Sequence, residues 1–302
     1  MCGIWALLGN YKDTIPDRHA LLRALEARGP EFTALLDISG SQASLGFTRL
    51  AINGLTPAGN QPFHDDGVYV VCNGEIYNYR ALAARWNIPL AEGTSDCAVL
   101  PFLARRLNPT ELCRTLDGVF AFAMVDTRAQ TLLVARDPYG VRPLFHGTFT
   151  SAHGQTTHMW ASEIKGLYKG CDVIEPFPPG TWAKYHLEMG HLIAQERYHY
   201  VPHVKLAAFC GLDNRENAKR ALRQALMTAV QKRLMSDRPV GALLSGGVDS
   251  SLIAAIAARE LAKYGKKLHT FSIGMPGSTD LQYAQKVADH IGSIHHNVLV
   301  KP

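Results

Sequence analysis

Long apolar runs are missing from this 302-residue sequence. No stretch approaches the ~20 consecutive apolar residues that a bilayer-spanning helix needs. The N-terminal segment MCGIWALLGN is apolar, but no basic residues precede it and the sequence soon turns polar, so we expect no signal peptide. No long basic block occurs either, although the net charge is +5. Charge therefore gives no reason to expect nucleic-acid binding.

Closely spaced cysteine pairs are also missing. No CxxC pair occurs, and none of the cysteines lies at ligand-like spacing from a histidine; the six are Cys2, Cys72, Cys97, Cys113, Cys171 and Cys210. This scatter argues against a zinc site and favours free thiols. Free thiols are typical of a reducing compartment, so we expect a cytoplasmic protein.

Length and composition predict about two globular domains, because 47% of the residues are hydrophobic and 19% are charged. Residues 1–200 contain short strand patterns separated by Gly, Pro, Asn and Asp. One of these strands, 68–72, should end at Asn73-Gly74, a pair typical of tight turns. The other elements expected here are a hairpin of strands 119–125 and 131–135 and helices near 17–28 and 94–107. The pattern predicts an α+β domain with mostly antiparallel strands.

Residues 201–214 have the polar, His- and Pro-containing composition of a linker, and a different pattern follows. Asp213 or Asn214 can cap a helix with an apolar stripe that runs from Ala218 to Leu234. Strands and helices then alternate, at 240–244, 250–264, 268–273, 280–291 and 296–300. This order predicts the start of a parallel, doubly wound α/β sheet. Three strands make a small parallel sheet, so we expect residues 215–302 to be an incomplete domain.

Cys2 is a candidate nucleophile because it directly follows the initiator Met1. Its small side chain favours removal of the methionine, which would leave a thiol and an α-amine on one residue. Such an amine, whose pKa in an unperturbed peptide is near ~7.7–8.0, can act as a general base. A nucleophile activated by its own terminal amine is a known catalytic arrangement. The alternative is an ordinary cysteine at the start of an apolar strand.

The segment Ser245-Gly246-Gly247-Val248-Asp249-Ser250-Ser251 follows the apolar strand 240–244 and precedes a helix. Glycines let the backbone approach a phosphate closely, and a helix N-terminus offers free N–H groups. Serine hydroxyls add donors, and Asp249 could hold Mg²⁺ on the phosphate oxygens. The loop lacks the lysine of a GxxxxGK[ST] motif. Phosphate binding is the favoured interpretation, and an ordinary strand-to-helix turn is the alternative.

Several motifs in order resemble one known family: MCGIWALLG, RGP at 28–30, RLAI at 49–52, NGEIYN at 73–78, TSD at 94–96 and RDPYGVRPL at 136–144. Together they look like the N-terminal-nucleophile glutaminase domain of asparagine synthetases. The SGGVDSS loop resembles the pyrophosphate-binding loop of ATP pyrophosphatases, the synthetase half of that family. The resemblance implies an α+β amidotransferase sandwich, with antiparallel sheets and helices. A partial α/β doubly wound ATP pyrophosphatase domain would follow it.

The resemblance assigns roles to residues in both halves. Cys2 would be the nucleophile, with Asn73 and Gly74 forming the oxyanion hole. Arg49 would bind the α-carboxylate of glutamine and Asp96 its α-ammonium, while Glu75 would contact the substrate; the glutamine pocket would comprise Arg49, Leu50, Ala51, Ile52, Asn53, Asn73, Gly74, Glu75 and Asp96. ATP would bind to Leu244, Ser245, Gly246, Gly247, Asp249, Ser250 and Ile273, with Leu244 and Ile273 beside adenine and ribose.

Each of these assignments has a plainer alternative. Arg49 could form a surface ion pair, Asp96 could cap the helix that follows it, and Glu75 could be an exposed carboxylate at a strand end. Leu244 and Ile273 could belong to the strand core. Near the domain boundary, Arg136, Asp137, Arg142 and residues 161–165 match family segments, and we expect an interface role or a buried ion pair there.

The implied reaction is glutamine-dependent asparagine synthesis. Glutamine would yield glutamate and ammonia, and ammonia would attack aspartate adenylated by Mg²⁺-bound ATP, giving asparagine, AMP and pyrophosphate. No tightly bound organic cofactor is implied, and the expected partners are glutamine, aspartate and ATP, with no nucleic acid and no membrane. A homodimer, or a second chain that completes the synthetase domain, could form.

Several alternatives remain open. The family's second nucleotide motif, Ser-Gly-Glu-Gly-Ser-Asp-Glu, does not occur in the sequence. A truncated or split chain would therefore act as a glutaminase only. Other interpretations are an amidotransferase with a different acceptor, such as a β-lactam synthetase relative, a tRNA-modifying ATP pyrophosphatase, or an inactive regulatory module.

Overall fold

The computed structural model describes residues 1–9, 17–200 and 214–301. The chain divides into two compact units, Met1–Val201 and Pro202–Pro302. Of the predicted linker at 201–214, all but residue 214 lies outside the described residues. No helix in the described parts of the chain is both long enough and apolar enough to cross a membrane.

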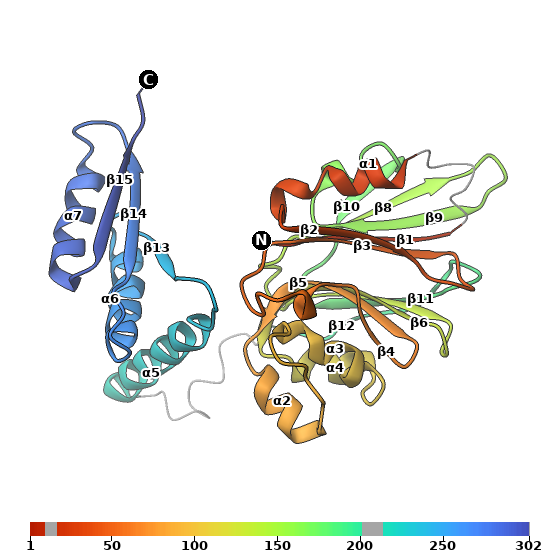
Figure 1. Ribbon diagram of the computed structural model, residues 1–302, viewed down its shortest axis with the longest axis horizontal. Helices are drawn as coiled ribbons and strands as arrows, with labels where there is room; N and C mark the ends of the chain where they lie inside the picture. The colour runs from red at the N-terminus through yellow and green to blue at the C-terminus, as the bar shows by residue number, and fades with distance from the viewer. Residues whose placement is uncertain (10–16, 201–213, 302) are drawn as a thin grey trace. The chain divides into compact units, whose positions relative to one another are not determined.

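The first unit is a sandwich of two six-stranded antiparallel sheets (Figure 1). In spatial order, the first sheet contains β10 (Val173–Pro176), β8 (Phe145–Thr150), β9 (Thr156–Ala161), β1 (Gly3–Leu8), β3 (Ala43–Arg49) and β2 (Phe32–Asp37). The second contains β12 (Leu192–Arg197), β11 (Thr181–His186), β7 (Thr131–Arg136), β6 (Gly118–Asp126), β5 (Val68–Ile76) and β4 (Phe63–Asp65).

Helices cover the outer faces of both sheets. Figure 1 shows α1 on the outside of the first sheet and α2, α3 and α4 on the outside of the second. These helices and the short 3₁₀ turns are α1 (Arg18–Arg23), α2 (Tyr79–Trp86), α3 (Leu100–Ala104), α4 (Pro109–Thr115), η1 (Glu26–Arg28), η2 (Pro57–Gly59), η3 (Asp96–Val99) and η4 (Ile164–Gly166). The α+β sandwich predicted from the sequence is confirmed.

Strand β1 carries Cys2 at its amino end and is buried along its whole length. Because side chains alternate along a strand, Ile4 and Leu8 enter the core between the sheets, whereas Trp5 and Leu7 pack in the layer beneath α1. Full burial of such apolar side chains contributes roughly 1.5–3 kcal/mol each. The strand next to the candidate nucleophile is therefore held from both faces.

The expected turn at Asn73-Gly74 is wrong. Both residues lie inside β5, which continues to Ile76 and pairs with β6 as far as Gly118. Gly74 is required for another reason, because a Cβ there would lie 2.6 Å from the carbonyl oxygen of Val119. Long-range pairing with β6 has overridden a local turn preference.

Two helices are shorter than their sequence patterns indicate. The helix expected over 17–28 ends at Arg23 and gives way to η1, and the one expected over 94–107 is the 3₁₀ turn η3 followed by α3. Pro101, in the first turn of α3, has no N–H to continue a regular helical ladder from η3. The hairpin of β6 and β7 is confirmed.

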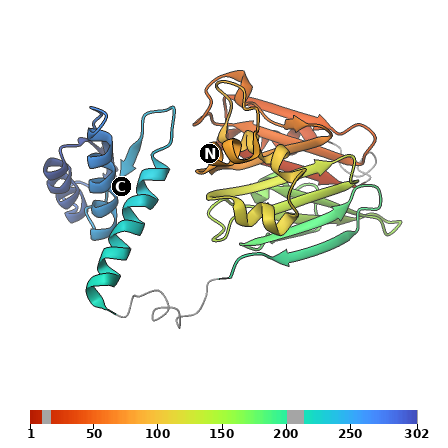
Figure 2. The same ribbon diagram turned by 90° about the horizontal axis from the view of Figure 1, so that it is seen from below.

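The second unit begins with α5 (Arg215–Arg233), whose N-cap is Asn214. The remaining elements alternate as predicted: β13 (Gly241–Leu243), α6 (Val248–Ala262), β14 (His269–Gly274), α7 (Thr279–Ile291) and β15 (Ile294–Leu299). The strands are parallel and lie in chain order, with α6 and α7 together beside them (Figure 2). A partial parallel sheet is thus confirmed.

Candidate active site

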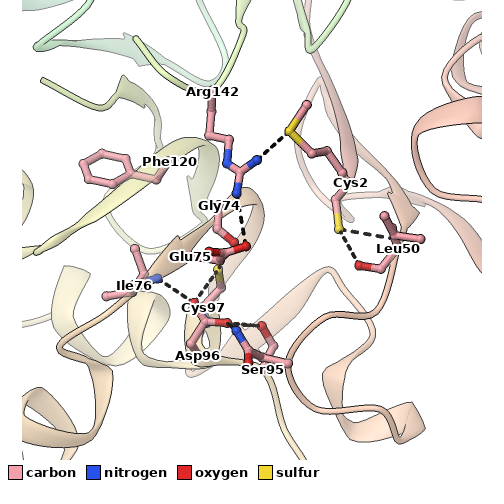
Figure 3. Close-up of polar contacts among 12 residues, drawn as sticks. Cys2, Leu50, Gly74, Glu75, Ile76, Ser95, Asp96, Cys97, Phe120 and Arg142 are labelled. Carbon is pink, nitrogen blue, oxygen red and sulfur yellow. Dashed lines mark hydrogen bonds and ion pairs between the residues drawn. The ribbon is translucent and has the colours of Figure 1, made fainter. Parts of the chain in front are cut away.

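Cys2 lies half-buried in front of β1, with its sulfur against the backbone of Leu50 (Figure 3). The Sγ atom is 3.4 Å from both the amide nitrogen and the carbonyl oxygen of Leu50. Burial raises the pKa of the Cys2 thiol, and the Leu50 hydrogen bond offsets only part of that effect. The resting thiol is consequently protonated at neutral pH and needs a base.

One pocket surrounds this thiol. All the residues predicted for the glutamine site line it, together with Met1, Phe47, Gly59, Gln61, Cys72, Ser95 and Arg142. With Met1 in place the space left in the pocket is about 30 Å³, room for about one or two water molecules. Met1 lines this pocket together with Cys2, so the methionine occupies part of the space beside the thiol.

Arg49, at the end of β3, is 6% exposed, so the alternative of a surface ion pair is wrong. Its Nη1 donates to the Thr56 carbonyl oxygen at 2.8 Å and to Asn60 Oδ1 at 2.6 Å, and its Nη2 contacts the Gly54 carbonyl oxygen. The guanidinium thus anchors the loop around η2 as one wall of the pocket. Binding of a substrate carboxylate by Arg49 stays a prediction.

Asp96 is 2% exposed and begins the short turn η3. It is not the N-cap, because Ser95 holds that position and its Oγ accepts from the Cys97 amide at 3.3 Å. The Asp96 carboxylate accepts from the Ile76 amide at 2.5 Å and from Ser95 Oγ at 3.0 Å (Figure 3). Burial outweighs these bonds and raises the pKa of Asp96 to about 6.

This raised pKa predicts a pH dependence for any cationic ligand of Asp96. The carboxylate is ionised above about pH 6 and neutral below it, and only the ionised form attracts an ammonium group. We therefore expect kcat/KM for glutamine to fall about tenfold for each pH unit below 6. The measurement is a pH profile of ammonia release, with Asp96→Asn as the control. An unchanged break in the control would assign it to another group.

Asn73 places an amide donor beside the nucleophile. With the amide oriented to satisfy its neighbours, Nδ2 donates to the Cys2 carbonyl oxygen at 3.2 Å and Oδ1 accepts from Arg28 Nη2 at 3.3 Å. Gly74 follows in the strand and also lines the pocket. A side-chain amide that donates to the backbone of the candidate nucleophile is close enough to serve as one donor of an oxyanion hole.

Glu75 is the next-to-last residue of β5, but its side chain is only 16% exposed and pairs with Arg142 at 3.2 Å, so the alternative of an exposed carboxylate is wrong (Figure 3). The other terminal nitrogen of Arg142 donates to Met1 Sδ at 2.6 Å. Asp137 accepts from three backbone amides of its own loop, those of Tyr139, Val141 and Arg142. These contacts shape the pocket rim within the first unit, and the expected interface role of the loop stays a prediction.

Two residues at the site, Arg28 and Gln61, were given no role from the sequence. Arg28 Nε donates to the Cys2 carbonyl oxygen at 2.8 Å, and Arg28 Nη1 pairs with Glu163 Oε1 at 2.8 Å. Gln61 pairs with the backbone of Cys72 through both atoms of its amide. Arg28 stands in the RGP motif, so its position was visible, but its partner lies 135 residues away in the sequence and could not be read from local pattern.

The candidate nucleotide loop joins β13 to α6 in the second unit. Ser245 and Ser250 are 2.9 Å apart at their hydroxyl oxygens, and Asp249 is exposed in the first turn of α6. Gly246 has φ +81°, and a Cβ there would lie 2.6 Å from the Ala284 amide nitrogen. This glycine is therefore required by packing against α7 whether or not a phosphate binds.

The two apolar residues of the predicted nucleotide site differ in solvent exposure. The Leu244 side chain is 1% exposed and belongs to the core with Val230 and Ala254, so only its backbone could face a ligand. Ile273 is 67% exposed. Among the described residues, no group of three or more His, Cys, Asp or Glu could hold a metal ion. Mg²⁺ at Asp249 would need phosphate oxygens and water as its other ligands.

Comparison with known proteins matches two family models to consecutive parts of the chain. Residues 1–220 match the family model described as glutamine amidotransferase domain, and residues 221–302 match the model described as asparagine synthase. The sequence is 36% identical to asparagine synthetase [glutamine-hydrolyzing] 2 of Oryza sativa subsp. japonica and 38% identical to the protein of the same name from Lotus japonicus. These alignments cover 99% and 98% of this chain, which spans about half the length of the relatives (49% and 50%).

A solved structure shares the fold. It is a glutamine phosphoribosylpyrophosphate (PRPP) amidotransferase from B. subtilis complexed with ADP and GMP, with a TM-score of 0.55. The match covers 98% of this chain and 81% of that one, at 16% sequence identity. Similarity at this level supports the architecture and carries no information about the acceptor.

Proposed function

The chain belongs to the glutamine amidotransferase domain family, and from this premise we propose that its first unit hydrolyses glutamine to glutamate and ammonia, with Cys2 as the nucleophile. The observation that carries the proposal is the pocket itself. It gathers the thiol, the Asn73 amide, the buried Asp96 and the Arg49 guanidinium from four separate segments of the chain. Together these groups match the parts of a zwitterionic amide substrate.

Removal of Met1 would supply the base and open the pocket. The α-amine would then belong to Cys2, beside the thiol whose proton it must accept. Burial already lowers the pKa of the Met1 amine, and the same effect on the Cys2 amine would favour its basic form at neutral pH. Loss of the Met1 side chain also frees Nη1 of Arg142 and the space that the side chain occupies, while Arg142 Nη2 keeps its pair with Glu75.

The chemistry then follows from the positions of the groups. The thiol proton passes to the amine as sulfur attacks the carboxamide carbon of glutamine. The carbonyl oxygen becomes an oxyanion, which accepts hydrogen bonds from the Asn73 side chain and the Gly74 amide. The C–N bond breaks, the leaving nitrogen takes the proton from the amine, and ammonia and a thioester form. Water, deprotonated by the same amine, hydrolyses the thioester to glutamate and restores the thiol.

For the second unit the proposal is ATP-dependent use of that ammonia. The phosphates of ATP, with Mg²⁺ near Asp249, would lie over Ser245–Ser250 at the N-terminus of α6. Aspartate would be adenylated with release of pyrophosphate, and ammonia would then give asparagine and AMP; the names of the relatives couple asparagine synthesis to glutamine hydrolysis. The proposal places this reaction in the cytoplasm. It also requires a complete synthetase domain, which would form with further polypeptide. A glutaminase-only chain or another acceptor would be the alternative.

The test follows both products of the purified protein. We expect ammonia and glutamate from glutamine, and asparagine only when aspartate, ATP and Mg²⁺ are present and the synthetase domain is complete. Ammonia release without asparagine, even with further polypeptide added, would favour the alternative. A protein that releases no ammonia from glutamine would contradict the proposed function.

A further inference from the structure

Glu163 stands outside the pocket and is tied to it through Arg28. Its Oε1 accepts from Arg28 Nη1 at 2.8 Å, and its Oε2 accepts from Lys165 Nζ at 2.8 Å. Burial alone would raise the pKa of Glu163, but the hydrogen bonds from Lys165 and Arg28 outweigh it and lower the pKa. The carboxylate is therefore ionised at neutral pH, and each oxygen has a cationic partner.

The segment that carries Glu163 is fixed to the strand of the nucleophile. Ser162 is fully buried, its Oγ accepts from the Ile4 amide at 3.0 Å, and its own amide donates to the Ile4 carbonyl oxygen at 3.0 Å. In the next turn, the Gly166 carbonyl oxygen accepts from Trp5 Nε1 at 3.0 Å. The Glu163 backbone consequently cannot shift without disturbing β1, only two residues beyond Cys2.

Arg28, which Glu163 holds in place, contacts two groups of the site. Its Nε holds the Cys2 carbonyl oxygen, and its Nη2 faces Asn73 Oδ1. A donor facing Oδ1 permits only the amide orientation in which Nδ2 points toward Cys2. With the amide reversed, an oxygen rather than a donor would lie beside the nucleophile, and the developing oxyanion would lose a hydrogen bond.

We infer that Glu163 is a positioning residue for the glutaminase reaction, acting through Arg28 to hold the Asn73 amide and Cys2 in their reactive arrangement. The inference rests on the proposed function of this pocket. Glu163 touches none of the groups predicted to bind glutamine, since its ion pairs are with Arg28 and Lys165. Its loss should therefore lower kcat and leave KM for glutamine nearly unchanged.

The experiment compares steady-state glutamine hydrolysis by the full chain and its variants. We expect Glu163→Gln to lower kcat about tenfold, less than the ~10²–10³-fold cost of losing an oxyanion donor outright, with KM within about twofold. Glu163→Asp keeps the charge on a shorter side chain and should lose less. Asp37→Asn is the matched control, because it removes a carboxylate that pairs with Arg18 in the same unit and should leave both constants unchanged.

A double-mutant cycle identifies the route of the effect. If Glu163 acts through Arg28, Arg28→Gln combined with Glu163→Gln should have the kcat of Arg28→Gln alone. Unchanged kcat in Glu163→Gln, equal losses in Asp37→Asn, or multiplicative losses in the double variant would overturn the inference. Should Glu163→Gln not fold, Glu163→Asp serves in the same cycle. Failure of the parent protein to hydrolyse glutamine would instead reject the proposed function, so the two failures are distinguishable.

Discussion

Replacement of Cys2 by alanine should abolish glutamine hydrolysis, with a loss of at least about 10⁴-fold in kcat. Alanine cannot form the thioester, and the structure describes Cys72, the other thiol at the pocket, as buried with 1% exposure. The thiol is half-buried and its removal leaves β1 intact, so the thermal midpoint should change little. The measurement is ammonia release with glutamine, beside a thermal melt.

Cys171→Ala is the matched control for the loss of a thiol. Cys171 is also partly exposed and free of disulfide bonding, but it packs against Gly147 in β8 rather than lining the pocket. Its replacement should leave kcat unchanged.

The intact mass of the parent protein should be lower than the mass of the full sequence by one methionine residue. Full activity with Met1 retained would reject the α-amine of Cys2 as the base.

Replacement of Asn73 by alanine should lower kcat about 10²–10³-fold, the usual cost of losing one oxyanion-hole donor. The side-chain amide nitrogen faces the Cys2 carbonyl oxygen and its Oδ1 faces Arg28, so alanine removes both the donor and the oxygen through which Arg28 orients it. Because an oxyanion forms only in the reaction, KM for glutamine should change much less than kcat. The measurement is the kcat and KM of glutamine hydrolysis.

Asn78→Ala provides the comparison for this prediction. Asn78 also uses its side-chain amide in two hydrogen bonds, to the Thr115 carbonyl oxygen and from the Asp117 amide, but it lies outside the pocket. We expect it to lower the thermal midpoint and leave kcat near the parent value. Equal kcat losses in the two variants would show that Asn73 acts through folding alone.

The stronger predictions from the sequence concerned segments whose signals are local. Apolar alternation located the β6–β7 hairpin, and a Gly/Ser turn between a strand and a helix located the loop after β13. A short side chain beside Met1 made Cys2 a candidate, and the resemblance of several motifs to one family assigned it the role of nucleophile, which stays a prediction. Each of these patterns spans a few residues, so neighbouring residues in the sequence carry enough information.

Local preference failed where distant parts of the chain compete with it. Asn73-Gly74 favours a turn in isolation, yet nine paired residues between β5 and β6 keep it extended. The helix expected over 94–107 is divided into η3 and α3. Asp96 is buried in the wall of the pocket, and Ser95 is the N-cap residue of η3 instead. In both places, burial and pairing contribute more free energy than the local preference they override.

The sequence by itself determined which chemical groups this protein carries and in what order, because residue type and short-range periodicity are properties of the chain alone. Only the tertiary structure decided that Cys2, Arg49, Asn73 and Asp96 line one pocket. It also decided that Arg28 meets Glu163 across 135 positions, and that burial raises the pKa of Asp96 to about 6. These properties depend on distances and solvent exclusion, which exist only once the two sheets have packed together.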